Sequence, residues 1–215
     1  MGCCRIIQAW WPITTTHNSM NKSAAVLAGF LLFSVLARGQ SASPIYALTA
    51  YASTGYVRNL SQFEAPPPGL NQNGFAGSIR IMWKPEYLLS AGLEVGRTHI
   101  YSVNQDQVQT EFGTTDLHSS KDAWLILPVF SMSPLPALEV NVGIGSAIST
   151  ATVESFGNTS NSSEFGSAFM ASVAYLVPLS GNLRLGGELK FIRINKYEDD
   201  NLSLQVTLAY RFLEW

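Results

Sequence analysis

Residues 202–212, with the sequence LSLQVTLAYRF, alternate between apolar and other side chains at every position. One face of this stretch carries Leu202, Leu204, Val206, Leu208, Tyr210 and Phe212. The other face carries Ser203, Gln205, Thr207, Ala209 and Arg211. Successive side chains of a β-strand point to opposite faces, so this period of two predicts a strand with one apolar face.

The same alternation recurs through the rest of the chain, and from Ile45 onward no segment shows a convincing helical stripe of period 3.6. The pattern predicts eight strands, near residues 45–58, 75–84, 88–101, 122–132, 137–150, 165–178, 182–194 and 201–212. Most of these segments are longer than the roughly 5–6 residues of a globular strand and match the roughly 9–11 of a tilted strand that crosses a bilayer. The sequence therefore predicts an all-β, eight-stranded, antiparallel up-and-down transmembrane barrel.

The connections between these strands alternate in length. Short ones lie at 85–87, 133–136 and 179–181, and longer polar ones at 59–74, 102–121 and 151–164, with a brief last one at 195–200. Alternation places all the long loops at one end, as in outer-membrane barrels with short periplasmic turns and longer external loops. Both chain termini are then expected on the periplasmic side.

A soluble barrel with an apolar interior would show the same alternation, so the polar face has to decide between the two. Lys and Glu normally cover a soluble surface, but here the polar face is mostly Ser, Gly, Thr, Asn and Ala, and only 13% of all residues are charged. Aromatic side chains are expected in two girdles at headgroup level. The short-turn girdle would contain Trp83, Tyr87, Phe130, Tyr175, Tyr210 and Phe212, and the other Tyr56, Phe75, Tyr101, Trp124 and Phe165.

The N-terminal part has the features of an export signal. Met20 and Lys22 precede an apolar run at 24–37, which is short for a spanning helix but suits a signal peptide, and Ala37 and Gly39 fit a cleavage site before Gln40. We therefore expect a signal peptide at 20–39 and a barrel domain at 40–215, with 1–19 an over-long, disordered start. A slightly later cut and an uncleaved membrane anchor are the alternatives.

Several kinds of site are not indicated by the sequence. Cys3 and Cys4 both precede the expected cleavage site, so disulfides and thiolate metal sites are not expected in the barrel. No His, Asp or Glu cluster has metal-ligand spacing, and no phosphate-binding glycine loop is credible, so no metal or cofactor is expected. A net charge of −2 gives no basic surplus for nucleic acid.

Residues 40–215 resemble the small porin-like outer-membrane β-barrel proteins of Gram-negative bacteria, chiefly in pattern. The most specific element is the ending Leu-Ala-Tyr-Arg-Phe at 208–212, which looks like the C-terminal strand signal read by the barrel-assembly machinery. In that family the signal closes on a terminal aromatic, so Tyr210 and Phe212 would act together with Trp215. The resemblance implies an outer-membrane location and contact with outer-membrane lipid and lipopolysaccharide.

Charged residues of the polar faces are expected inside the barrel. Arg80, Glu94, Glu188 and Lys190 should lie near mid-height, with Lys84, Glu139, Arg184 and Arg211 nearer the short turns. A charge in a low-dielectric lumen is costly unless it is paired, so these residues predict an ion-pair plug. The plug either only satisfies the lumen or also gates small solutes or ions.

Two polar groups fall outside this pattern. His118 and Ser120 stand two residues apart, so a catalytic pair oriented by Asp116 or Asp122 is a weak candidate within a polar loop. Arg97 and His99 fall on the predicted lipid face, where a bulge or contact with a headgroup phosphate would explain them.

The leading functional hypothesis is a non-enzymatic membrane scaffold whose exposed loops serve adhesion, partner contact or envelope integrity. The alternatives are a conduit for small solutes or hydrophobic compounds, a lipid A-modifying acyl hydrolase, and a secreted soluble ligand-binding barrel.

Overall fold

The structure is a computed structural model that describes residues 46–61, 66–85, 89–110, 113–196 and 199–215. Its strands are β1 (Ala47–Asn59), β2 (Leu70–Asn71), β3 (Asn73–Lys84), β4 (Leu89–Thr110), β5 (Gly113–Leu135), β6 (Leu138–Ser155), β7 (Asn158–Ser180), β8 (Leu183–Ile194) and β9 (Asp199–Glu214). The expected start segment and signal peptide, and Tyr87 of the expected girdle, lie outside the described residues. Within these ranges no helix has the length and apolarity needed to span a membrane.

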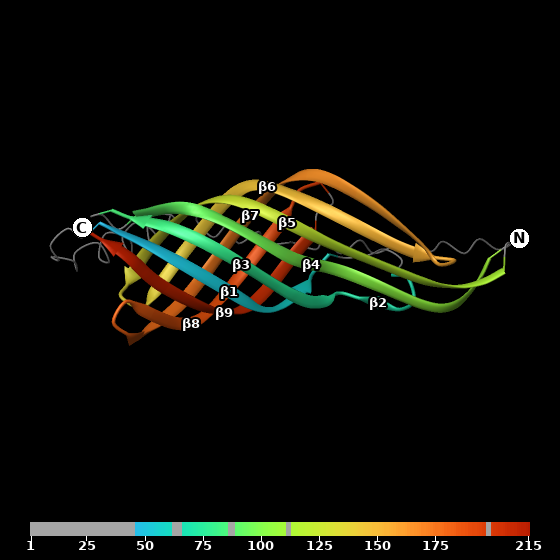
Figure 1. Cartoon of the computed structure of the whole chain (residues 1–215), viewed down its shortest axis with the longest axis horizontal. Coiled ribbons are helices and arrows are strands. Elements are labelled where there is room, and N and C mark those ends of the chain that lie inside the picture. Colours follow the sequence, from blue (N-terminus) through green and yellow to red (C-terminus); the bar gives the residue numbers. More distant parts are fainter. Residues whose placement is uncertain (1–45, 62–65, 86–88, 111–112, 197–198) are drawn as a thin grey trace, which may run out of the picture. The chain divides into compact units, whose positions relative to one another are not determined.

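Eight of the strands form a closed antiparallel ring (Figure 1). Neighbours in sequence pair with one another around the ring, β4 pairs with β5, and β1 closes the ring against β9 from Ala47↔Glu214 to Asn59↔Asn201. The two residues of β2 only add a short pairing to β4 at Val103 and Ser102. The predicted eight-stranded antiparallel barrel is therefore confirmed.

The outward face of the ring is apolar. Phe75, Ile144 and Leu204 are 78%, 69% and 64% exposed, and many other large apolar side chains point the same way. Soluble monomers rarely expose apolar patches of more than a few hundred Å², whereas a barrel surrounded by acyl chains requires such a surface. The alternation seen in the sequence thus places its apolar half outside.

The interior is filled by side chains, as expected when only eight strands close a barrel. The side chains that point inward are of two kinds, polar ones and apolar ones. The large apolar ones that are almost completely buried are Met82, Leu125, Leu127, Met170, Leu176 and Ile192. Small side chains at Ala123, Ala147 and Ala168 leave room for these larger ones. The lumen is therefore a packed core in which charged groups are embedded.

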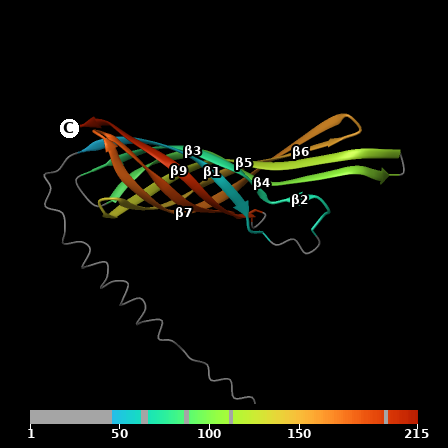
Figure 2. The same cartoon turned by 90° about the horizontal axis from the view of Figure 1, so that it is seen from below.

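The prediction of long loops is wrong for two of the three segments. Residues 102–110, 113–121 and 151–164 continue the strands as extended hairpins, so that β4 and β5 are 22 and 23 residues long and β7 is also 23. Figure 2 shows these hairpins projecting beyond the end of β1 and β3. Backbone pairing reaches Thr110↔Gly113 in one hairpin and Ser155↔Asn158 in the other, with a tight turn at Phe156 and Gly157.

The end of the barrel that carries these projections is called the hairpin end, and the opposite one the terminal end. At the terminal end the short turns join β5 to β6 and β7 to β8. There the backbones of Tyr46 and Trp215 exchange hydrogen bonds of 3.0 and 3.1 Å, and the Tyr46 ring stacks between those of Trp83 and Trp215. The described short turns thus lie at the end opposite the projecting hairpins.

Candidate functional site

Four charged side chains meet inside the barrel at mid-height. Arg80 of β3 and Glu94 of β4 are direct cross-strand partners, and Glu188 and Lys190 are alternate residues of β8, so both point inward. The Arg80 guanidinium binds both carboxylates at 3.2 Å, and Lys190 Nζ lies 2.7 Å from Glu94 Oε1 and 3.8 Å from Glu188 Oε1. Two cations and two anions make this mid-height cluster electrically neutral.

Glu188 is the most highly connected member of the mid-height cluster. Besides its ion pairs, it accepts hydrogen bonds from the hydroxyl groups of Ser172 at 2.6 Å, Thr207 at 3.2 Å and Ser53 at 3.3 Å. Because β-strands alternate, each hydroxyl comes from an inward position of a different strand. A buried carboxylate needs several donors to replace lost hydration, and small polar residues supply them here.

A second group lies nearer the terminal end. Glu139 of β6 accepts from Lys84 Nζ at 2.7 Å and from Arg184 Nη1 at 3.0 Å, and Arg184 also donates to the carbonyl of Pro136. Arg211 does not share a hydrogen bond with this group; its guanidinium pairs with Glu214, and its side chain is partly exposed. Its assignment to the lumen network is therefore corrected: Arg211 lies at the barrel rim, beside an acid on its own strand.

Tyr51 joins the two groups. It could not be predicted from the sequence, because an inward Tyr of β1 fits the alternation like any other residue of that strand. Its hydroxyl donates to Glu139 at 3.3 Å, while the Arg80 guanidinium lies 4.7 Å from the ring centroid. Arg80 Nε and Nη2 are buried without a hydrogen-bond partner among the described residues. The ring face provides a cation–π contact that offsets part of this loss.

A third charged group, a single ion pair, lies toward the hairpin end. Lys121 Nζ is 2.6 Å from Asp199 Oδ2, and both side chains are largely buried. Sequence reasoning missed this pair because Lys121 fell in a predicted loop and Asp199 just before a predicted strand. Tyr101, expected in the outer girdle, packs instead on the interior core, with its ring 5.9 Å from Lys121 Nζ.

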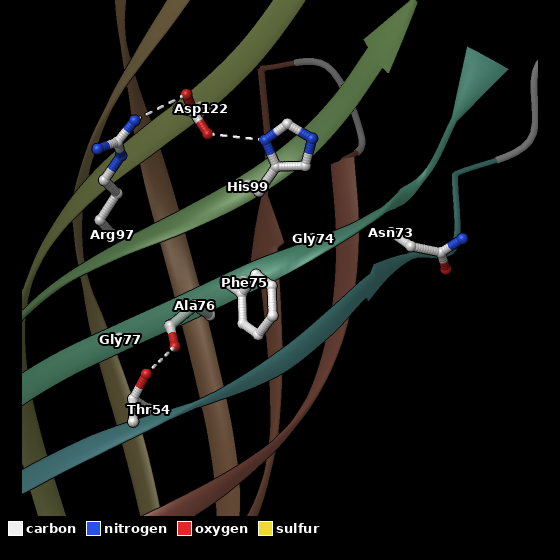
Figure 3. A pocket seen from close by; sticks show the side chains of 9 residues that line it. All are labelled: Thr54, Asn73, Gly74, Phe75, Ala76, Gly77, Arg97, His99 and Asp122. Carbon is white, nitrogen blue, oxygen red and sulfur yellow. Dashed lines mark hydrogen bonds and ion pairs between the residues drawn. The ribbon is translucent and has the colours of Figure 1, made fainter. Parts of the chain in front are cut away.

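A bulge in β4 explains why the Tyr101 side chain points inward. The β4–β5 register shifts between His99 and Tyr101, so the residues beyond Ile100 change face. Before the bulge, Arg97 and His99 lie outside, and both bind Asp122 of β5 at 3.0 and 2.9 Å. Figure 3 shows these three side chains beside a groove at the outer surface.

The weak catalytic candidates lie on the projecting part of β5. His118 Nδ1 is 3.1 Å from the Asn104 side-chain oxygen, and Ser120 is at the next position on the same face. The carboxylates proposed to orient the histidine have other partners: Asp116 accepts from the Gln107 backbone, and Asp122 binds Arg97 and His99. Among the described residues, no group of three or more His, Cys, Asp and Glu side chains could hold a metal ion.

The last strand runs to Glu214, two residues further than the sequence indicated. Its register against β1 shifts between Leu48 and Thr49, which leaves Phe212 as the additional residue. Tyr210, Phe212 and Trp215 are all exposed at 51%, 42% and 63%. The Trp215 ring stacks on that of Tyr46 at the terminal end.

These features define a class: an outer-membrane type of eight-stranded β-barrel with an apolar outer surface and an ion-paired interior. No known protein-family model matches the sequence, and no characterised protein matches it. Solved structures resemble the fold at low sequence identity.

Three of the similar structures are outer-membrane proteins. A major outer membrane protein of Thermus thermophilus is 16% identical, with a TM-score of 0.48, over 78% of this chain and 99% of that one. The attachment invasion locus protein Ail of Yersinia pestis is 11% identical, with a TM-score of 0.43, over 80% and 100%. The outer membrane protease OmpT of Escherichia coli is 11% identical, with a TM-score of 0.39, over 80% and 98%.

Proposed function

We propose that this protein is an integral outer-membrane protein that is not an enzyme: a closed barrel that anchors two projecting hairpins for contact with partners outside the cell. The signal peptide at 20–39 would direct export, and the terminal end, with its short turns, would face the periplasm. Insertion by the barrel-assembly machinery would use the last strand with Tyr210, Phe212 and Trp215. The observation that carries the proposal is the sheet that extends past the ring.

Beyond the ring, β4, β5, β6 and β7 remain paired as a four-stranded sheet. The β5–β6 ladder reaches Leu117↔Ser155, whereas the β7–β8 ladder stops at Ala168↔Ile194. Among the described residues, no strand pairs with the outer edge of β7 from 158 to 166. An edge strand offers a row of backbone donors and acceptors to which another chain can add a strand, so this sheet suits contact with a protein.

The interior favours an anchor over a conduit. The side chains of Arg80, Glu188 and Lys190 are 2%, 0% and 1% exposed. These side chains are thus closed off from solvent, which supports an interior that is sealed at mid-height. Opening a path would require the separation of buried opposite charges, which costs several kcal/mol.

The test compares the intact protein with a variant in which residues 152–161 are replaced by an Asn-Gly turn, which shortens the β6–β7 hairpin but leaves the ring complete. Both should fractionate with the outer membrane and migrate faster on a gel before heating than after. We expect the shortened variant to lose adherence of expressing bacteria to epithelial cells and to one another. Equal adherence would contradict the contact role of this sheet.

Conductance separates the anchor from the conduit. Purified protein in a planar bilayer should give no current above background, and Glu188→Ala should give none either if the ion pairs only satisfy the lumen. A wild-type current that disappears or changes with Glu188→Ala would replace the anchor with a gated conduit.

A further inference from the structure

The outer surface carries a charged cluster at a place where a barrel is otherwise apolar. Arg97 and His99 of β4 and Asp122 of β5 all point outward, and Arg97 is paired across the sheet with Gly77 on one side and Trp124 on the other. Trp124 is 52% exposed, and nearby Phe75 is 78% exposed. The charged cluster is therefore level with these exposed aromatic side chains near the hairpin end.

Bilayer energetics restrict where such a cluster can lie. An Arg on the lipid face of a barrel costs about 2–4 kcal/mol at the midplane but only about 0–1 kcal/mol near the interface. Exposed Trp and Tyr side chains mark that interface. Arg97 and His99 thus lie at the level of lipid headgroups, where phosphate is the abundant anion.

The geometry leaves a donor of Arg97 available to such an anion. Asp122 accepts one bond from Arg97 Nη2 and one from His99 Nδ1, which fixes both side chains. In Figure 3 the other terminal nitrogen of Arg97 points away from Asp122. Arg193 is different, because its Nε and Nη2 both bind Asp200, at 2.7 and 2.6 Å.

The surface beside the cluster is a groove of about 540 Å³, lined by residues of β1, β3, β4 and β5 that include Thr54, Asn73 and Phe75. Two glycines keep it open. A Cβ atom on Gly74 would lie 2.4 Å from Cδ2 of His99, so only glycine permits this position of the ring. Gly77, the neighbour of Arg97 on β3, adds no side chain over the groove floor.

We propose that this groove binds the phosphate group of an outer-leaflet lipid, with Arg97 as the donor, Asp122 as the carboxylate that positions the guanidinium, and Phe75 beside the lipid's apolar part. The inference goes beyond the proposed function: it requires the barrel in a membrane but does not depend on the hairpins or on any external partner.

The test is native mass spectrometry of the protein released from uncharged detergent micelles, with three probes: phosphatidylglycerol, diacylglycerol, which lacks the phosphate, and inorganic phosphate. Variants are Arg97→Gln, Arg97→Lys, which keeps the charge, and Arg193→Gln as the matched control at the same end of the barrel. Heat-modifiable migration verifies that each variant is folded.

We expect phosphatidylglycerol to bind more tightly than diacylglycerol, and Arg97→Gln to weaken it about fivefold, the effect of one basic residue near a lipid surface. Arg97→Lys should retain much of the binding, and Arg193→Gln all of it. Equal binding of the two lipids, or no effect of Arg97→Gln, would overturn the proposal and leave a groove for acyl chains only. Competition by inorganic phosphate at the concentration of the lipid would also overturn it, in favour of a site for the free anion.

Discussion

Replacing Glu188 by Gln should strongly destabilise the barrel while hardly changing its shape. The substitution removes one negative charge from a neutral group of four and leaves Arg80 and Lys190 facing Glu94 alone. Breaking a buried ion pair by removing one partner costs about 3–5 kcal/mol, since a charge is left uncompensated in a site without water. We expect the free energy of unfolding to fall by that amount.

A second substitution makes the prediction specific to charge. Adding Arg80→Met to Glu188→Gln restores neutrality and leaves the Lys190–Glu94 pair of 2.7 Å in place. The double variant should therefore be more stable than Glu188→Gln alone, with a coupling free energy of at least about 2 kcal/mol. Neutral pairs can be replaced by apolar side chains of similar volume at little cost.

Urea titration of protein refolded into lipid vesicles, followed by tryptophan fluorescence and by heat-modifiable migration, measures the wild type, Glu188→Gln, Arg80→Met and the double variant. A loss below about 1 kcal/mol for Glu188→Gln would refute the reasoning, because it would mean that the charge is not buried. Additive effects of the two substitutions would equally show that Arg80 and Glu188 do not interact in the folded barrel.

The interior and the surface supply three further predictions. Gly186→Ala should cost about 1–3 kcal/mol in the same titration, since its Cβ would lie 1.8 Å from the carbonyl oxygen of Tyr175, whereas Gly187→Ala meets nothing closer than 3.9 Å and should be nearly neutral. Tyr51→Phe should cost about 1–2 kcal/mol, because Glu139 loses one buried donor; no change in urea midpoint would argue against that bond. A photolabel carried in acyl chains should modify the outer positions Val142 and Val206, and labelling only by a water-soluble reagent would contradict the membrane orientation.

The alternation of apolar and polar residues predicted the barrel and its faces because period two is the direct signature of a strand between two different environments. It failed on the projecting hairpins. Residues 158–164 are Asn, Thr, Ser and Glu on both faces, so no alternation distinguishes a strand from a loop there. Those segments are strands because their backbones continue the ladders that begin in the barrel wall.

The partners of the interior charges could not be predicted either. Arg80 and Glu188 are 108 residues apart, and Lys84 and Glu139 are 55 apart, so their meeting depends on the stagger of strands around the ring. The alternation along each strand indicated which charged side chains point inward. Their positions along the barrel axis, however, depend on the stagger of the strands. Arg211 shows the difference. The alternation along its strand is that of an inward residue, but it lies at the rim of the barrel.

The pairing of β1 with β9 makes the first and last strands of the barrel direct neighbours. A chain that lacked β9 would leave β1 and β8 as the two free edges of an open sheet. Closure of the barrel therefore depends on the strand that is synthesised last, and the backbone donors and acceptors of both edges stay unpaired until β9 is in place.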